Sequence, residues 1–316
     1  MKRIHPHYRK HLAVATGWLL ACLSLLPALS AGEGSRADGK TLLLLLSADS
    51  PRYLTVEERF RARLAEHCRQ APACPEVRVA LADEAAQPAV TPGLVVAVGH
   101  KASNAALQGA TATPQLHVMV SRSHFLERAP GAEVSAIYLE QPPDRLLAFA
   151  RFLLPDRRRI GVLLGREGPW RPDRLRTIGR EAGAEMQIME VAASDEIGRR
   201  LRRLRPRIDL LLALPDPLVY NRATLATILL ATFRDRIPVV GFSRGMVKAG
   251  AVAALFSSPE SVGTEAADRA WRLLQGAPAS RDFPSRFETA VNRRVAGALH
   301  LVLPSDREID RWRPQP

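Results

Sequence analysis

The sequence predicts an α/β protein made of two doubly wound lobes. Short apolar runs, each with the length of a buried parallel strand, alternate with amphipathic helical stretches after residue 30. This alternation is typical of parallel sheets that carry helices on both faces. About eleven strands are expected, which is more than one small open sheet usually holds. The 316 residues of the chain suffice for two hydrophobic cores.

The first predicted strand is the apolar run TLLLLLS at 41–47. Thr55 and Glu58 have the spacing of a capping box, which predicts that a helix begins there. The apolar residues of this helix recur at helical spacing, at Val56, Phe60 and Leu64. The later strand candidates are short apolar runs bounded by polar or turn residues: 77–81, 94–98, 115–119, 134–139, 160–164, 185–189, 208–214, 238–240, 251–255 and 287–291.

Amphipathic stretches between these strands predict helices. Ser258, as an N-cap, and Pro259, at the first helical position, predict where the last long helix begins. The apolar faces are Leu146, Ala150 and Leu153; Leu225, Ile228, Leu229 and Phe233; and Val262, Ala266, Ala270 and Leu273.

The first thirty residues have the pattern of a secretory signal peptide. Basic residues within 2–10 precede an apolar stretch at 12–26, and Ala28 and Ser30 supply the small residues before a cleavage site. Cleavage after Ser30 predicts a periplasmic protein. Two alternatives stay open, because residues 19–22 resemble a lipoprotein box that ends in Cys22, and because an uncleaved anchor has a similar pattern.

Cys68 and Cys74 are the two cysteines of the chain after the leader. In an oxidising compartment, a pair at such close range predicts a disulfide. The bond would pin the end of one helix to the connection that follows. No CxxC motif or nearby histidine pair accompanies these cysteines, which argues against a metal or redox role.

The formal charge of the chain is +13, from 45 basic and 32 acidic residues. Most of the basic residues are arginines spread along the chain, and the densest runs, at 157–159 and 199–207, stand at the edges of apolar segments. Nucleic-acid binders usually combine a basic block with a recognisable motif. We therefore predict no nucleic-acid partner, and no motif in the chain indicates a cofactor or a metal.

In open α/β sheets, ligands bind beyond the carboxyl ends of the strands. This rule selects the loops at 47–53, 99–104, 121–123, 140–142, 165–170, 215–221 and 241–243. They contain hydroxyls, amides, aromatic rings and one or two carboxylates. This mixture suits a polar small molecule with an apolar part rather than a metal ion.

The second half carries several motifs in a characteristic order. A strand leads to Asp216, Pro217 and Asn221; PVVGFS follows at 238–243 and AGAVAAL at 249–255. The helix start PESVG at 259–263 and a tail that reads VNRRVAGAL and ends in LP at 303–304 complete the series. With these motifs the chain resembles the substrate-binding proteins of ABC transporters that have a type 1 periplasmic-binding fold, a family that includes aromatic amino-acid binders. The resemblance is strong over 134–304 and weaker before it.

The resemblance implies two Rossmann-like lobes joined by three crossovers, with a hinge and a ligand cleft between the lobes. The crossovers would lie near Glu140, Leu255 and Ala277. After a leader at 1–30, the first lobe would comprise 31–139 and 255–277. The second lobe would comprise 140–254 and 278–316.

The resemblance and the strand-end loops together imply ligand contacts from both lobes. Gly99 begins a helix whose free N–H groups suit a ligand carboxylate, and Asp216 suits an ammonium group. Aromatic rings that would cover an apolar group are Tyr53, Trp170, Tyr220 and Phe242. The full set of expected ligand-binding residues is Ser47, Asp49, Ser50, Tyr53, Gly99, His100, Ser103, Gln141, Asp216, Tyr220, Asn221, Phe242 and Ser243.

The chain also departs from the family pattern. His100 and Lys101 stand where relatives tend to have small or hydroxyl residues, and Pro217 stands where amino-acid binders commonly have Asn. Arg52 and Lys101 add positive charge to the side of the first lobe. These differences leave room for a ligand more acidic than an aromatic amino acid.

For partners, the resemblance implies a monomer without a cofactor that closes on its ligand and docks on an ABC permease in the inner membrane. The same fold and cleft also suit a protein that reports its ligand to a membrane sensor or another assembly. A neighbouring gene pair for a permease and an ATPase would favour import.

The hypothesis of a serine hydrolase rests on GFSRG at 241–245, which follows a predicted strand and matches the nucleophile elbow G-x-S-x-G. Asp268 or Asp282, followed by His300, would complete the order Ser243, Asp, His. The elbow would come after about the ninth strand, far later than in α/β-hydrolases, and His300 lies in an apolar helical stretch. We therefore predict a binding protein without catalytic residues and keep a serine hydrolase as a minor alternative.

Overall fold

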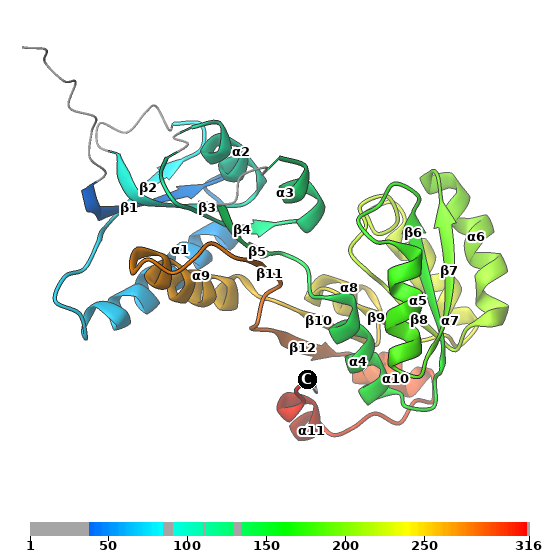
Figure 1. The fold of residues 1–316 in the computed structure, drawn as a ribbon. Helices are drawn as coiled ribbons and strands as arrows, with labels where there is room; N and C mark the ends of the chain where they lie inside the picture. Colours follow the sequence, from blue (N-terminus) through cyan, green and yellow to red (C-terminus); the bar gives the residue numbers. More distant parts are fainter. Residues whose placement is uncertain (1–37, 85–90, 110–111, 129–133, 315–316) are drawn as a thin grey trace, which may run out of the picture. The chain divides into compact units, whose positions relative to one another are not determined.

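The computed structural model describes residues 38–84, 91–109, 112–128 and 134–314 (Figure 1). The described strands form two six-stranded sheets. The predicted leader at 1–30, including Cys22, lies outside the described residues. The α/β class with two doubly wound units is confirmed.

The first sheet is entirely parallel and has the order β11-β5-β4-β3-β1-β2. Because the middle strands are covered on both faces, their sequences are apolar without alternation. The strands are β1 (Asp38–Leu46), β2 (Glu76–Leu81), β3 (Pro92–Val98), β4 (Gln115–Val120), β5 (Val134–Tyr138) and β11 (Arg281–Asp282).

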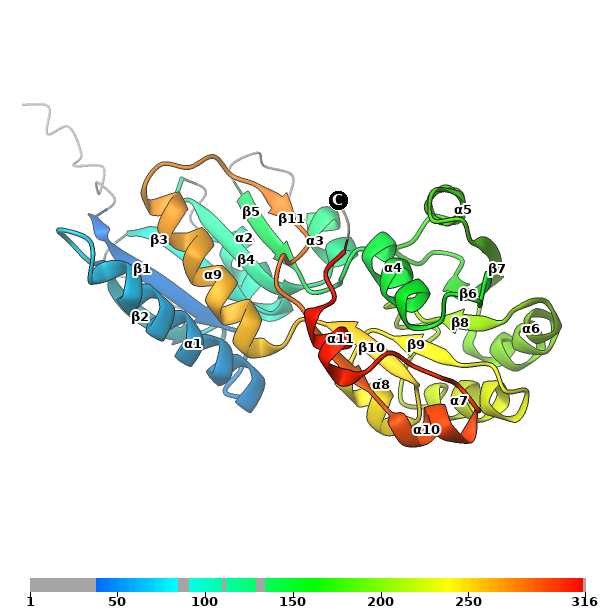
Figure 2. The ribbon, with the colours of Figure 1, turned by 90° about the horizontal axis from the view of Figure 1, so that it is seen from below.

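Helices cover both faces of this sheet, as the two ribbon views show (Figures 1 and 2). In β1, Leu42, Leu44 and Leu46 pack with α1 and α9 on one face. Leu43 and Leu45 pack with α2 on the other face, which explains the unbroken leucine run. The helices are α1 (Pro51–Cys68), α2 (His100–Gln108), α3 (Arg122–Arg128) and α9 (Pro259–Leu274).

The second sheet has the order β12-β10-β9-β8-β6-β7, and only β12 runs antiparallel to its neighbour. Its strands are β6 (Arg159–Gly165), β7 (Glu185–Val191), β8 (Leu210–Leu212), β9 (Val239–Gly241), β10 (Ala253–Phe256) and β12 (Glu288–Val291).

Helices cover both faces of the second sheet as well. Residues of α4 and α5 pack on one face, and residues of α6, α7 and α8 pack on the other. The helices of this part are α4 (Pro143–Leu153), α5 (Pro172–Glu181), α6 (Ile197–Leu204), α7 (Leu225–Arg234), α8 (Arg244–Ala249), α10 (Arg293–Ala298) and α11 (Asp306–Arg311), with 3-10 turns at Ser194–Glu196 and Arg205–Arg207.

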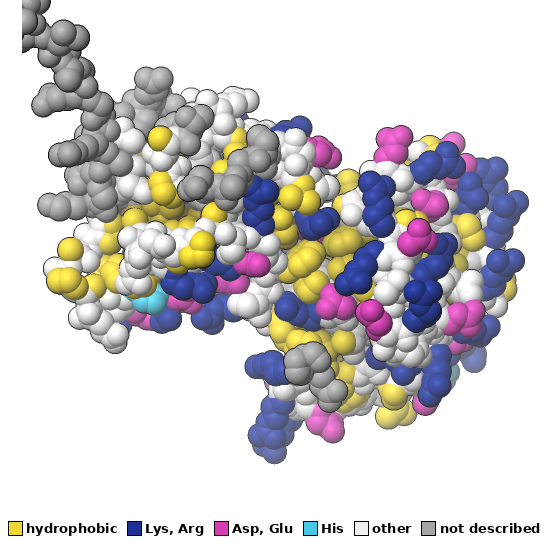
Figure 3. Space-filling model, in the orientation of Figure 1, with side chains coloured by type: hydrophobic (Ala, Val, Ile, Leu, Met, Phe, Trp, Pro, Cys, Tyr) yellow, Lys and Arg dark blue, Asp and Glu magenta, His cyan; other side chains and the backbone are white. Residues whose placement is uncertain are grey.

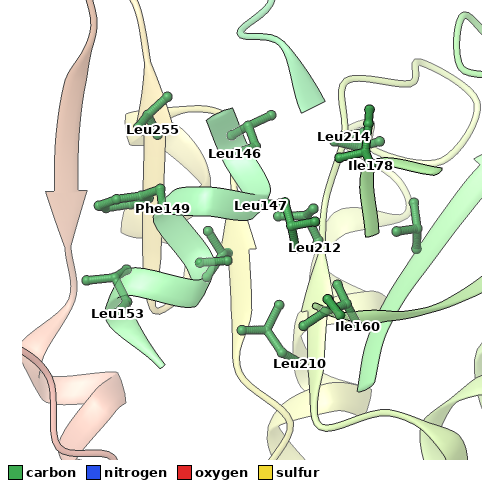
Figure 4. Packing of buried hydrophobic residues seen from close by; sticks show 14 of the residues in the cluster. Leu146, Leu147, Phe149, Leu153, Ile160, Ile178, Leu210, Leu212, Leu214 and Leu255 are labelled. Carbon is green, nitrogen blue, oxygen red and sulfur yellow. The ribbon is translucent and has the colours of Figure 1, made fainter. Parts of the chain in front are cut away.

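The core of the second part is built around α4 (Figure 4). Leu146, Leu147 and Phe149 of this helix are fully buried, and they belong to one cluster with Leu210 and Leu212 of β8. The leucines of α4 recur with the period of a helix, and those of β8 recur at every second residue. The two sets pack against each other, so each is buried by the other.

Two local expectations need correction. Helix α1 begins at Pro51 with Ser50 as its N-cap residue, one turn before the predicted capping box. Proline suits the first helical position because its missing N–H is not needed there, and the Thr55 hydroxyl instead donates to the Pro51 carbonyl at 2.8 Å. The predicted strands all overlap observed ones, but β11 escaped prediction because its two residues carry no apolar pattern.

The chain passes between the two sheets at three places. The first crossover, at 139–142, joins β5 to α4. The second, Ser257 and Ser258, follows β10, and the third, at 283–287, joins β11 to β12. The last two lie a few residues later than Leu255 and Ala277, because β10 continues to Phe256 and β11 still pairs with β5.

A disulfide joins Cys68 to Cys74, with 5.2 Å between their Cα atoms. Cys68 is the last residue of α1, and Cys74 lies just before β2. The bond therefore pins the end of the helix to the next connection, as its spacing predicts.

Gly263 shows why the PESVG motif ends in glycine. A Cβ atom at this position of α9 would lie 2.5 Å from the Val56 carbonyl oxygen of α1, and 2.9 Å from the Cβ of Arg59. We expect Gly263→Ala to lower the free energy of unfolding by about 1–2 kcal/mol, since the strain of overpacking exceeds the gain in helix propensity. Urea denaturation measures the change.

Gly297→Ala is the matched control for this prediction. Gly297 also lies in a helix, α10, and no described atom outside its own stretch of helix lies within 4 Å of the added methyl group. This variant should be as stable as the parent or up to about 1 kcal/mol more stable. Equal effects of the two substitutions would contradict close packing of α1 on α9.

Candidate ligand-binding site

A pocket of about 450 Å³ is lined by residues at the carboxyl ends of strands in both sheets. Its position agrees with the rule for ligand sites in open α/β sheets. The first sheet contributes His100, Ser121, Ser123, Leu139, Glu140 and Gln141. The second contributes Pro169, Pro215, Asp216, Pro217, Tyr220, Phe242, Ser243, Phe256 and Ser257.

The structure brings together about half of the expected ligand-binding residues around this pocket. They are His100, Gln141, Asp216, Tyr220, Phe242 and Ser243. Each follows the end of a strand, so the strand-end rule carries the prediction for these positions. The other expected residues lie outside the pocket lining.

Ser47, Tyr53 and Gly99 lie together at the start of α2. The Ser47 hydroxyl donates to the Val98 carbonyl at 2.8 Å and accepts the Ala102 N–H at 3.0 Å. Gly99 has φ +89°, and a Cβ atom there would lie 2.5 Å from the Ser47 hydroxyl and 2.7 Å from the Tyr53 hydroxyl. The serine thus takes a helix N–H that was expected to be free for a ligand carboxylate.

Ser103 and Asn221 also use their polar atoms within the protein. Ser103 is fully buried, and its hydroxyl lies 2.8 Å from Nδ1 of His117. The Asn221 carboxamide accepts the N–H groups of Ala223 and Thr224. Asp49 is exposed just before α1. The hydroxyl of Ser50 is buried without a hydrogen-bond partner among the described residues.

Asp216 is 3% exposed and organises the loop that follows β8. One carboxylate oxygen accepts the Gly165 N–H at 2.7 Å, and the other accepts the Leu218 N–H at 3.0 Å. The carboxylate therefore ties together the loops after β6 and β8. Among the described residues it forms no ion pair, although it also lines the pocket.

Glu140 is a second buried carboxylate in the pocket, and it is 4% exposed. Its two oxygens accept the backbone N–H of Arg122, at 3.0 and 3.2 Å. Burial raises the pKa of this carboxyl group, and the hydrogen bond from Arg122 offsets part of that effect. Within the described part of the chain, no cationic side chain pairs with Glu140.

His100 brings a neutral imidazole to the pocket. Burial lowers the pKa of this ring, and the nearby His124 and Arg128 lower it further. The Ser121 N–H donates to Nε2 of His100 at 3.0 Å, so the proton of the neutral ring is on Nδ1. The ring lies against that of His124, with 4.2 Å between the two centroids.

Tyr220 and Phe242 form an aromatic wall, with their rings edge to face at 5.9 Å. The Tyr220 hydroxyl is buried and has no hydrogen-bond partner among the described residues. Burial raises the pKa of this hydroxyl, and the charge of Asp216 raises it further. A polar group of a ligand would satisfy this hydroxyl, because a buried polar atom without a partner is costly.

Gln141 lies in the first crossover and also lines the pocket. Its carboxamide nitrogen donates to the Ser257 hydroxyl at 2.7 Å, and that hydroxyl donates to the Arg286 carbonyl at 2.7 Å. Arg145 donates to the Gln141 carboxamide oxygen and to the Pro284 carbonyl. These bonds connect all three crossovers next to the pocket.

Positive charge does not gather in the pocket. Lys101 pairs with Asp83, the Arg52 guanidinium lies over the Tyr53 ring, and neither lines the pocket. On the face drawn in Figure 3, Lys and Arg side chains lie interspersed with acidic ones. The positive charge of Arg52 and Lys101 therefore lies outside the pocket, whose charged lining residues are Glu140 and Asp216. Arg122, Arg166 and Arg171 line a neighbouring cavity that shares Asp216 with the pocket.

The residues of the serine hydrolase alternative do not assemble. The Ser243 hydroxyl caps α8 by accepting the Met246 N–H at 3.2 Å. Asp268 is bound by Arg63 and His67 of α1, and Asp282 pairs with Arg269. His300 is exposed after α10. Each carboxylate thus has partners in the first lobe, whereas Ser243 belongs to the second.

Several pocket residues were absent from the expected set. Ser121, Ser123, Glu140 and Pro169 lie in strand-end loops that the sequence selects, so their signal was present. Trp170, expected as a cover for a ligand, instead donates its indole N–H to the Pro215 carbonyl at 2.8 Å. Phe256 and Ser257 gave no signal, since Phe256 is the last residue of β10 and Ser257 lies between that strand and Ser258, the N-cap of α9.

Pocket and fold define a two-lobed small-molecule binding protein. The family model of the ABC transporter substrate binding proteins matches residues 129–304, more than half of the chain. The chain therefore belongs to this family. The comparison of the sequence with curated proteins found no match.

Solved structures of low sequence identity share the fold. A ligand-free, open substrate-binding protein with adhesive properties from Clostridium difficile has a TM-score of 0.65 at 17% identity, over 86% of this chain and 98% of that one. An ABC domain from Streptococcus pneumonia in complex with L-Trp has a TM-score of 0.55 at 14% identity, over 84% and 96%. A periplasmic ribose ABC transporter protein from Conexibacter woesei has a TM-score of 0.53 at 16% identity, over 88% and 99%.

Among the described residues, no helix is both long enough and apolar enough to cross a membrane.

Proposed function

We propose that this protein is the solute-binding component of an ABC-type importer and that it captures a small organic molecule as a monomer. The observation that carries the proposal is the pocket of about 450 Å³, which takes its lining from strand ends of both sheets. Such a volume matches the range of small-molecule sites. The family of the chain supports the same function.

The proposed mechanism is hinge closure without covalent chemistry. A ligand first contacts the residues of one lobe, and the other lobe then closes over it by changes at the three crossovers. The hydrogen bonds of Gln141, Ser257 and Arg145 hold the three crossovers next to one another. The closed form would then dock on a permease in the inner membrane.

A thermal-shift screen of the purified chain tests this function. The panel holds amino acids, amines, small carboxylates, sugars and purines. A ligand at about 100 times its Kd stabilises the folded state by roughly 2.7 kcal/mol, which raises Tm by several degrees. Mass spectrometry of the denatured protein finds any ligand that co-purifies and masks the site. An unchanged Tm with every compound, and no co-purified ligand, would contradict the proposal.

We also propose that the chain is exported and cleaved after Ser30. The support is the signal-peptide pattern of the first thirty residues. The intact mass of the protein from the periplasm distinguishes the alternatives. Cleavage after Ser30 leaves an unmodified chain from Ala31, whereas a lipoprotein would begin at a lipid-modified Cys22. A full-length chain in the membrane would contradict both.

A further inference from the structure

Charged side chains of one sign line the pocket. Glu140 follows β5 of the first sheet, and Asp216 follows β8 of the second. Both side chains are at least 96% buried, and no Lys or Arg lines the pocket with them. Buried carboxylates in proteins are normally paired with a cation.

The protein itself supplies only backbone donors to these two groups. Glu140 accepts the backbone N–H of Arg122, and Asp216 accepts backbone N–H groups from Gly165, Leu218 and Val219. Arg145 is occupied by Gln141 and Pro284, and Arg244 by Glu288. Arg122, Arg166 and Arg171 line the neighbouring cavity, which shares Asp216 with this pocket, and among the described residues none of them forms an ion pair with either carboxylate. The two carboxylates therefore keep lone pairs for a ligand.

The pocket offers no comparable receptor for a ligand carboxylate. His100 is neutral for the reasons given above, and the carboxamide of Gln141 is used by Arg145 and Ser257. At the start of α2, the Ser47 hydroxyl already accepts the Ala102 N–H. Serine hydroxyls remain, but they carry no charge to balance a carboxylate.

The rest of the lining is apolar or aromatic. Tyr220, Phe242 and Phe256 supply rings, and Leu139 and three prolines supply aliphatic surface. Such a lining suits an apolar body, and ring faces also attract organic cations. The pocket thus combines acceptors for a positive charge with space for an apolar group.

We infer that the natural ligand is an organic amine: a cation with an apolar or aromatic body and no carboxylate. The inference rests on the proposed solute-binding function and narrows it. Its ammonium group would lie between Glu140 of one lobe and Asp216 of the other. The two negative charges repel each other, and both would be attracted to the cation, so binding of the cation would favour closure of the lobes.

Matched compounds with the same aromatic body test this inference by calorimetric titration. The probes are phenethylamine, L-phenylalanine and 3-phenylpropanoate, and the indole set of tryptamine, L-tryptophan and indole-3-propionate. The inference predicts that each amine binds at least about tenfold more tightly than its amino acid, a difference of 1.4 kcal/mol. The propanoates should give no measurable heat of binding.

Glu140→Gln tests the role of the first carboxylate. The variant keeps an acceptor for the Arg122 N–H but removes the charge, and we expect it to weaken amine binding about tenfold or more. Glu66→Gln is the matched control, since Glu66 is exposed on α1, pairs with Arg63 and lines neither this pocket nor the neighbouring cavity. If Glu140→Gln fails to fold, the inference is tested by the parent protein alone, through the ratio of its affinities for the amine and for the amino acid.

The outcomes separate this inference from the proposed function. Tighter binding of an amino acid or a propanoate than of the matched amine overturns the inference but keeps a solute-binding protein. Equal amine affinity in the parent and in Glu140→Gln also overturns it. If no probe binds and the denatured protein releases no small molecule, both the inference and the proposed function are wrong.

Discussion

Asp216→Ala is expected to lower the free energy of unfolding by roughly 3–6 kcal/mol, from the loss of about two charge-assisted hydrogen bonds. The carboxylate joins the turn at Gly165, after β6, to the turn at Leu218, after β8, through hydrogen bonds of 2.7 and 3.0 Å. Alanine leaves these buried N–H groups without an acceptor. Ligand binding should be lost as well, since the same residue lines the pocket.

Asp216→Asn separates the hydrogen bonds from the charge. The asparagine keeps one carbonyl oxygen, so it can still accept from Gly165 or Leu218, and its loss of stability should be clearly smaller than that of alanine. Urea denaturation of the three proteins gives the comparison. A loss below about 1 kcal/mol for alanine would show that the loops do not depend on this carboxylate.

When the pH falls from 7 to 4, the free energy of unfolding should decrease by about 3 kcal/mol through His117 alone. Burial lowers the pKa of His117 to about 4, with a smaller effect from Arg281. In the unfolded chain the ring has its usual pKa of about 6.5. Between these values the unfolded state binds the extra proton, so stability rises with pH and falls on acidification.

The surroundings of His117 explain why it stays neutral. The Gln115 carboxamide nitrogen donates to the Ala106 carbonyl, which turns its oxygen toward Nε2 of His117 at 3.0 Å. An oxygen there requires a proton on Nε2, so Nδ1 is the acceptor for the Ser103 hydroxyl at 2.8 Å. Protonation would place a charge in a fully buried ring without a carboxylate partner among the described residues.

His117→Gln measures this contribution. Glutamine keeps a donor and an acceptor but does not titrate. The slope of unfolding free energy against pH, between about pH 4 and 6.5, should decrease by the equivalent of one proton relative to the parent. Identical slopes in the two proteins would show that His117 is not held neutral in the folded state.

Much of the fold follows from local patterns in the sequence. The leucine run of β1 and the leucines of α4 each have the period and length of their element, and both are buried as those periods require. The capping box at Thr55 failed because Ser50 and Pro51 give a stronger start one turn earlier. Strand β11 depends on pairing with β5, which no local pattern of two residues can encode.

The candidate site can be predicted from the sequence less completely than the fold, for a physical reason. The sequence identifies the strand-end loops, but it does not show which polar atoms are already used by distant parts of the chain. Ser47 bonds to residues after position 97, and Ser103 bonds to His117. These partners are set by the sheet order, so only the structure separates Glu140 and Asp216, which face the pocket, from serines that hold the fold.

The most direct test of the account is a titration of a variant whose pocket is filled. Ser123 lines the pocket, and Ser123→Trp places a large ring there. Leu230→Trp is the control, because Leu230 is exposed on α7 and does not line the pocket. The compound that raises Tm most in the screen should bind the parent and Leu230→Trp with one site per chain, and should not bind Ser123→Trp. Unchanged binding to Ser123→Trp would place the ligand elsewhere and contradict the account.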